Sequence, residues 1–164
     1  MRTDSFGLAH IPALKRRELA DVRARLKVAP PRARGLKGAS VLIGKTGIIA
    51  EIKRSSPSMG LIASGDAAAI ASRYENAGAF AVSVLTDSTH FGGSWDDLGA
   101  VTRSVELPVL CKEFVCFPEQ VDLAAALGAD LVLLIARMLS RLDLAALYRR
   151  SIQAGIAPIV EVHD

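Results

Sequence analysis

The apolar residues of this chain gather into five short runs, and helix-like segments separate one run from the next. Each run is nearly continuous and too short for a buried helix, which is typical of a strand covered on both faces. Strands are therefore predicted at residues 48–53, 79–86, 108–112, 130–135 and 158–162. Because such strands belong to parallel sheets, the pattern predicts an α/β fold.

The segments between these runs carry helix start and stop signals. Residues that favour a first helical turn stand at Asp66, Ser94, Pro118 and Ser140. Three segments end at a glycine that leads directly into the next strand region, at 78–79, 128–129 and 155–156. The chain therefore contains an internal strand–helix repeat. Two architectures stay open at this point. One is an open doubly wound sheet, and the other is a partial β/α barrel with its first five parallel strands and their covering helices.

The first 47 residues do not follow this repeat. An extra N-terminal helix is predicted over residues 12–27, followed by a proline stop at 30–31 and a loop rich in glycine and basic residues. We therefore divide the chain into an N-terminal helix and loop at 1–47 and an incomplete β/α barrel at 48–164. The basic residues of the first part are interpreted as a solvated helix face and loop: Lys15, Arg16, Arg17, Arg23, Arg25, Lys27, Arg32, Arg34 and Lys37.

The composition limits the classes of function. Of the 164 residues, 51% are hydrophobic and 23% charged, so one globular domain with its own core is expected. With 5% aromatic residues and no recognition motif, the net charge of +3 does not indicate nucleic-acid binding but suits a small anionic substrate. No run approaches the roughly 18 apolar residues that span a bilayer, and no secretory signal is recognised. We expect no membrane contact and a cytoplasmic location.

Charged residues occupy the carboxyl ends of three predicted strands. Glu51 and Lys53 share one face of the first strand, because side chains alternate along a strand. Lys112 ends the third strand, and Glu161 lies near the end of the fifth. A charge in a buried strand is costly unless it is paired or belongs to a site, and barrels place their chemistry at this end. These two lysines and two carboxylates predict an acid–base site.

The sequence meets neither the pattern of a phosphate-binding loop nor the spacing of a metal site. Residues 44–46 read Gly-Lys-Thr, but position 39 is alanine where a P-loop needs glycine, and a strand rather than a helix follows. The three histidines show no metal-ligand spacing, and Asp96 and Asp97 fit the first turn of a helix better than a metal site. We therefore expect neither a phosphate loop nor a metal site.

Six segments become specific when they are read together. Residues 48–62, IIAEIKRSSPSMGLI, carry the pattern E-x-K-x-x-S-P-S-x-G. In order follow SVLTD at 83–87, FGGSWDDL at 91–98, LPVLCKEF at 107–114, GADLVLLI at 128–135 and PIVEVHD at 158–164. This joint pattern resembles the indole-3-glycerol-phosphate synthase family.

The resemblance implies a (β/α)8 barrel of tryptophan biosynthesis that works without a cofactor. Such an enzyme closes the indole ring of 1-(2-carboxyphenylamino)-1-deoxyribulose 5-phosphate with loss of CO2 and water. By motif, Lys112 would be the general acid, Glu161 the general base, and Lys53 the lysine that binds the substrate carboxylate. Glu51 would orient these groups and help to move protons. The implied substrate-binding residues are Ser56, Ser83, Phe91, Phe114 and Leu133.

Two departures from the family pattern change the expectation. The family usually has an aspartate after the catalytic lysine, and this chain has Glu113. A barrel of this kind needs roughly 250 residues, and this chain has 164. We therefore expect a C-terminally truncated barrel that is weakly active or inactive alone and self-associates through open edges. The alternatives are a non-catalytic half-barrel and another phosphate-binding barrel, such as phosphoribosylanthranilate isomerase.

Overall fold

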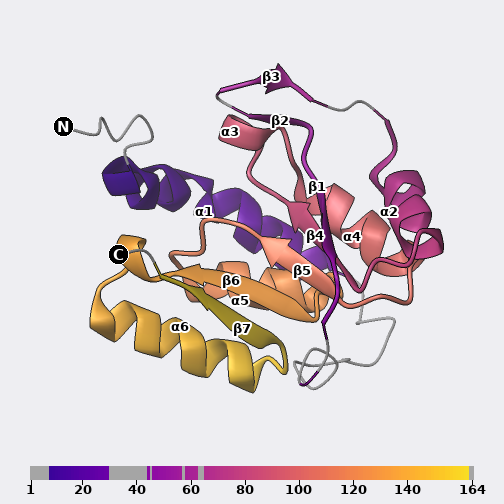
Figure 1. Cartoon of the computed structure of the whole chain (residues 1–164). Coiled ribbons are helices and arrows are strands. Elements are labelled where there is room, and N and C mark those ends of the chain that lie inside the picture. The colour runs from indigo at the N-terminus through magenta and orange to yellow at the C-terminus, as the bar shows by residue number, and fades with distance from the viewer. Residues whose placement is uncertain (1–7, 30–43, 45, 57, 63–64, 163–164) are drawn as a thin grey trace.

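The computed structural model describes residues 8–29, 44, 46–56, 58–62 and 65–162, and its centre is a parallel sheet. The sheet contains strands β1 (Ile49–Ile52), β4 (Ala81–Leu85), β5 (Val109–Lys112), β6 (Leu131–Ile135) and β7 (Ala157–Glu161). These strands lie side by side in chain order, and every neighbouring pair is parallel (Figure 1). A doubly wound sheet reverses its strand order at a switch point, so the sequential order decides for the partial β/α barrel.

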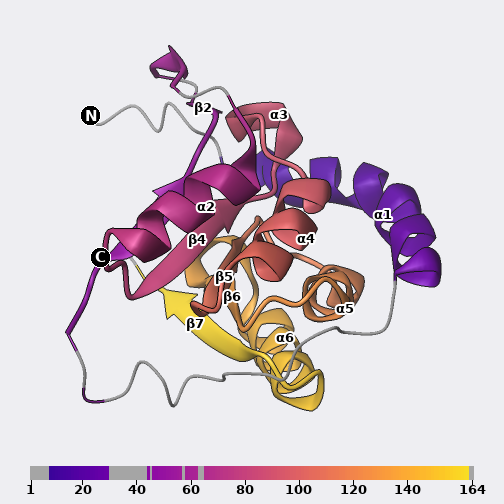
Figure 2. The same ribbon diagram turned by 90° about the vertical axis from the view of Figure 1, so that its right-hand side faces the viewer.

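Four helices connect these strands and cover one side of the sheet. They are α2 (Ala67–Asn76), α4 (Trp95–Ser104), α5 (Pro118–Ala126) and α6 (Arg141–Gln153), and they form an arc outside the strands (Figure 2). The side chains of Asp66, Ser94 and Ser140 each accept a backbone N–H of the first turn, as the predicted caps should. The predicted repeat is confirmed, with element ends that differ by one or two residues.

Side chains alternate between the two faces of the sheet and build two apolar clusters. The outer cluster packs against the helices and includes Val84, Val132, Leu134 and Cys111. Burial raises the pKa of the Cys111 thiol, which fits a core residue rather than a nucleophile. The inner cluster contains the alternate positions of the same strands: Leu110, Leu131, Leu133, Ile135 and Ala157. The inner face therefore leads directly to the predicted charged residues at the strand ends.

The N-terminal helix α1 (Ile11–Val28) connects the two clusters. A short 3-10 turn, η1 (Leu8–His10), precedes α1, and α1 itself packs against α5. Ile11 belongs to the inner cluster and Val22 to the outer cluster. The beginning of α1 thus lies at the end of the sheet where β7 finishes (Figure 1). None of the helices in the described ranges is long and apolar enough to cross a bilayer.

Short elements surround the carboxyl ends of the strands. The segment after β1 contains a hairpin of β2 (Ser55–Ser56) and β3 (Gly60–Leu61). Helix α3 (Ser88–Phe91) follows β4, and the 3-10 turn η3 (Ala136–Met138) follows β6. The chain between α3 and α4 passes so close to β4 that a Cβ atom on Gly93 would overlap the carbonyl oxygen of Leu85. Only glycine fits at this crossing.

Candidate active site

A pocket of about 670 Å³ opens at the carboxyl ends of the strands, beside the start of α1. Its charged lining residues come from β1, β5, β7 and the segments that follow β1, β5 and β6: Glu51, Lys53, Lys112, Glu113, Arg137 and Glu161. Its apolar lining residues are Leu8, Ala9, Pro12, Leu85, Phe91, Phe114, Leu133, Ile135 and Met138. The pocket therefore combines charge with a large apolar wall, which suits a ligand that is both anionic and aromatic.

The structure brings all four predicted acid–base residues to this one pocket. Glu51 lies on β1 and Lys53 directly follows that strand, Lys112 is the last residue of β5, and Glu161 is the last residue of β7. They converge because parallel strands present their carboxyl ends at the same edge and their alternate residues on the same face. Their catalytic roles stay predictions from the family resemblance.

Glu51 lies between the two lysines. Lys112 Nζ donates to Glu51 Oε2 at 2.7 Å, and Lys53 Nζ lies 3.9 Å from Glu51 Oε1. Each of the three side chains is about one-third exposed, with values of 32% for Glu51 and Lys53 and 39% for Lys112. Solvent screens pairs of this kind, so they add little stability. The arrangement is suited to chemistry instead, because two ammonium groups that share one carboxylate can bind an anion and transfer a proton.

The strand register explains how Lys112 reaches Glu51 across an intervening strand. On β4, Ser83 stands opposite Glu51 on one side and opposite Leu110 on the other. Lys112 is two residues beyond Leu110, so it shares the inner face and ends next to the pocket.

An aromatic wall faces the charged residues. The ring centroids of Phe91 and Phe114 lie 6.0 Å apart, and those of His90 and Phe114 lie 5.9 Å apart with nearly perpendicular ring planes. Leu133 from β6 continues this wall on the inner face. Aromatic and aliphatic groups arranged in this way can hold a planar ring. Three of the predicted substrate-binding residues thus line the pocket.

The two predicted serines do not line the pocket. Ser56 is buried in the β2–β3 hairpin, where its Oγ accepts the backbone N–H of Met59 at 3.1 Å. Ser83 is buried within the sheet, and its Oγ has no hydrogen-bond partner among the described residues. Their roles in substrate binding remain predictions.

Arg54 anchors the segment that carries this hairpin. Its Nε and Nη2 donate to the carboxylate of Asp97 at 3.0 and 2.7 Å, and its Nη1 donates to the carbonyl of Gly65 at 2.7 Å. The hydrogen bonds that the Arg54 guanidinium donates to Asp97 raise its pKa. This two-point contact ties the segment after β1 to the first turn of α4, beside the pocket.

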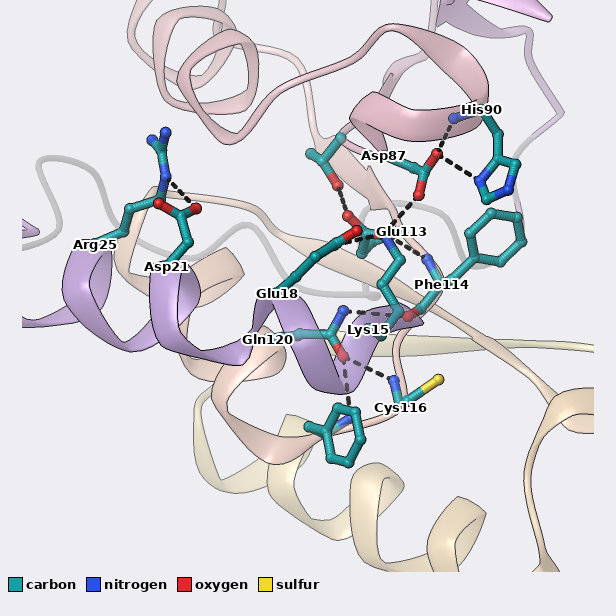
Figure 3. Close-up of polar contacts among 12 residues, drawn as sticks. Lys15, Glu18, Asp21, Arg25, Asp87, His90, Glu113, Phe114, Cys116 and Gln120 are labelled. Atoms are coloured by element: carbon teal, nitrogen blue, oxygen red, sulfur yellow. Dashed lines mark hydrogen bonds and ion pairs between the residues drawn. The ribbon is translucent and has the colours of Figure 1, made fainter. Parts of the chain in front are cut away.

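The interpretation of Lys15 as a solvated basic residue is wrong. Its side chain is 1% exposed, and its Nζ lies 2.6 Å from Asp87 Oδ2 and 2.8 Å from Glu113 Oε1 (Figure 3). A signal for this burial exists in the sequence, because Ile11 and Leu19 stand one helical turn before and after Lys15. That spacing puts position 15 on the apolar stripe of α1.

Burial and charge shift the pKa values of this cluster in different directions. Burial alone would lower the pKa of Lys15, but the charge of Glu113 and the hydrogen bond to Asp87 raise it. Burial acts to raise the pKa of Asp87, yet Lys15 holds it below its ordinary value. At Glu113 burial prevails, so its pKa is raised in spite of Lys15. Lys15 is therefore held as an ammonium, and Asp87 is the more firmly charged carboxylate.

Gln120 is a second residue that sequence reasoning missed. Its Nε2 donates to the carbonyl of Phe114 at 3.1 Å, and its Oε1 accepts the N–H groups of Cys116 and Phe117 at 2.9 and 3.0 Å. This buried amide therefore fixes the chain between β5 and α5, which carries Phe114 into the pocket.

Comparison with known proteins gives this pocket a family context. The family model for indole-3-glycerol phosphate synthase matches residues 8–164. The relative of that name from Crocosphaera subtropica is 45% identical over 152 residues, covering 91% of this chain and 51% of the relative. The relative from Exiguobacterium sibiricum is 51% identical over 118 residues, covering 71% of this chain and 46% of the relative. The relative from Parafrankia sp. is 47% identical over 155 residues, covering 93% of this chain and 57% of the relative.

The chain spans about half the length of the curated relatives that it matches. The matched range contains all five strands of the sheet and every residue that lines the pocket. Among the barrel families considered from the sequence, the match selects the synthase over phosphoribosylanthranilate isomerase. The chain belongs to the indole-3-glycerol phosphate synthase family.

Proposed function

We propose that this pocket binds 1-(2-carboxyphenylamino)-1-deoxyribulose 5-phosphate and that its residues close the indole ring with loss of CO2 and water. One observation carries the proposal. Two lysines that share Glu51 face an aromatic wall inside a single pocket, in a chain that matches the synthase family. The lysines meet the anionic groups of the substrate, and the wall meets its benzene ring.

The proposed chemistry begins with proton transfer from Lys112. The ring carbon that bears the carboxylate forms a bond to the ketone carbon, and Lys112 delivers a proton to the ketone oxygen as negative charge develops there. The bond between the ring carbon and the carboxylate then breaks. CO2 leaves, and the electron pair restores the aromatic ring. Lys53 holds the carboxylate before this step, and the apolar wall holds the ring.

Dehydration completes the indole. The new hydroxyl takes a second proton from the Lys53 ammonium and leaves as water, and Glu161 removes a proton from the neighbouring carbon that is bonded to nitrogen. The electron pair of that C–H bond forms the double bond of the indole. Glu51 touches both lysines, so it is placed to return a proton to the lysine that has donated one.

Removal of the Lys53 charge is expected to weaken substrate binding. Lys53→Met retains the length of the side chain but loses its charge-assisted hydrogen bond to the carboxylate, so the Kd should rise by about tenfold to a hundredfold. Isothermal titration calorimetry with the purified chain measures this change. The exposed Lys27 on α1 supplies the control, and Lys27→Met should bind as the wild type does. Equal affinity in all three proteins would sink the proposed role.

A second proposal concerns partners, because both edge strands of the sheet expose apolar residues. Strands β1 and β7 each pair with a single neighbour within the described part of the chain. Ile49 on β1 is 43% exposed, and Val160 on β7 is 39% exposed. An exposed strand edge with apolar side chains favours pairing with another chain. We propose that a second copy of this chain covers these edges.

Sedimentation equilibrium tests this proposal. The wild type should associate at micromolar concentration, and the double variant I49K/V160K should shift toward monomer. L142K places the same charge on an exposed leucine of α6 and should leave the association unchanged. A wild type that sediments as a monomer contradicts the proposal. The cytoplasmic location, and the lack of contact with nucleic acid and membrane, stay predictions from the sequence.

A further inference from the structure

A buried charge cluster lies directly behind the aromatic wall of the pocket. It consists of Lys15 from α1, Asp87 at the start of α3 and Glu113 directly after β5 (Figure 3). All three side chains are 1% exposed. The proposed reaction uses none of them, and they come from three segments that are far apart in the sequence.

The Lys15 ammonium is held by three carboxylates. Its Nζ donates hydrogen bonds to Asp87 Oδ2 at 2.6 Å and Glu18 Oε2 at 3.0 Å, and it forms an ion pair with Glu113 Oε1 at 2.8 Å. Buried charges persist only when they are paired and hydrogen-bonded in this way. The position of Lys15 is therefore tightly determined, and so is the distance between the two buried carboxylates that it joins.

Each carboxylate is hydrogen-bonded to the segment that carries one of the two phenylalanine rings of the aromatic wall. Asp87 Oδ1 accepts the backbone N–H of His90 at 2.6 Å, which caps the short helix that ends in Phe91. Glu113 Oε1 accepts the backbone N–H of Phe114 at 2.7 Å. A single hydrogen bond thus connects each carboxylate to the segment that carries a ring.

The cluster also reaches the backbone of Lys112. Thr86 donates its hydroxyl to Glu113 Oε2 at 2.7 Å, and its backbone N–H donates to the carbonyl of Lys112 at 3.2 Å. The ends of β4 and β5 are therefore connected through side chains as well as through the sheet.

We propose that Lys15 is a positioning residue. From its place on the N-terminal helix, it sets the distance between Phe91 and Phe114 and thereby the fit of the aromatic ring of the substrate. This inference rests on the proposed function of the pocket. Without the ammonium, the two buried carboxylates repel each other, and the segments that carry the rings separate. The 6.0 Å spacing of the ring centroids is the quantity that changes.

The test uses 2-(methylamino)benzoate, which carries the ring, the amine and the carboxylate of the proposed substrate but no sugar phosphate. Glu113→Gln keeps the size of the side chain and most of its hydrogen bonds while it removes one charge from the cluster. The Kd of the probe should rise by about tenfold, the scale on which small displacements of a binding wall act. Glu119→Gln, at a surface ion pair with Arg23, should leave the Kd unchanged.

Backbone amide NMR supplies a readout independent of probe binding. In Glu113→Gln the amide signals of both Phe114 and His90 should move, although His90 is bonded to Asp87 and not to the changed residue. The double variant K15M/E113Q should bind the probe no more weakly than Lys15→Met alone, because both substitutions break the same ion pair. Additive losses, or a His90 amide that does not move, overturn the inference. If the wild type fails to bind the probe, the proposed function fails, and the two amides still decide the positioning role.

Discussion

Replacement of Lys112 by methionine is expected to slow ring closure by about 10²- to 10⁴-fold, the range that general acid catalysis contributes. Methionine fills the same space but carries no proton, so the ketone oxygen would gain negative charge without a donor. The hydrogen bond to Glu51 at 2.7 Å is lost as well, which leaves that carboxylate with the more distant Lys53. Product formation should be followed with protein in excess over substrate, because slow turnover is expected of this chain alone.

The control for this measurement is Lys27→Met, which removes the same charge from an exposed position on α1. Its rate should match that of the wild type. Glu51→Gln should retain binding but lose rate, because it keeps the size of the side chain and removes the proton carrier between the lysines. If Lys112→Met closes the ring at the wild-type rate, Lys112 is not the acid.

The largest expected loss of stability follows from Lys15→Met. It leaves Asp87 and Glu113 buried without a cation, and breaking a buried ion pair in this way costs about 3 to 5 kcal/mol of the free energy of unfolding. Urea unfolding followed by circular dichroism measures the change. Lys27→Met should alter the free energy of unfolding by no more than about 0.5 kcal/mol, as surface substitutions do.

The pH dependence of this difference checks its cause. The folded-state pKa of Lys15 is raised above its ordinary value of 10.5, so the stabilisation is fully present below pH 10.5. As the pH rises further, the unfolded chain loses the proton first and stability falls. The advantage of the wild type over Lys15→Met should therefore shrink above pH 10.5. A difference that stays constant into strong alkali would show that packing, rather than charge, causes the loss.

The strand–helix repeat and the meeting of the charged residues were predictable because both follow from short-range rules. Alternation puts Glu51 and Lys53 on one face, and parallel strands bring Lys112 and Glu161 to the same edge. These conclusions need only the period of the pattern and the direction of the strands. They need no knowledge of which side chains touch.

The parts that escaped prediction depend on contacts between distant segments. Lys15 meets Asp87 72 residues away, and nothing within α1 identifies that partner. The apolar neighbours of Lys15 on the helix indicated burial, but a basic composition suggested a solvated face. Gln120 escaped for a similar reason, because its three hydrogen bonds go to backbone groups that carry no sequence signature. Both residues shape the wall of the pocket without lining it.

The most direct test of the account is a methyl NMR titration of the chain with 1-(2-carboxyphenylamino)-1-deoxyribulose 5-phosphate. Leu85, Leu133 and Ile135 line the pocket, whereas their strand neighbours Val84, Val132 and Leu134 face the helices. We predict that the methyl signals of the first group shift saturably and that those of the second group stay in place. The absence of saturable shifts, or shifts confined to the second group, would contradict the claim that this pocket is the substrate site.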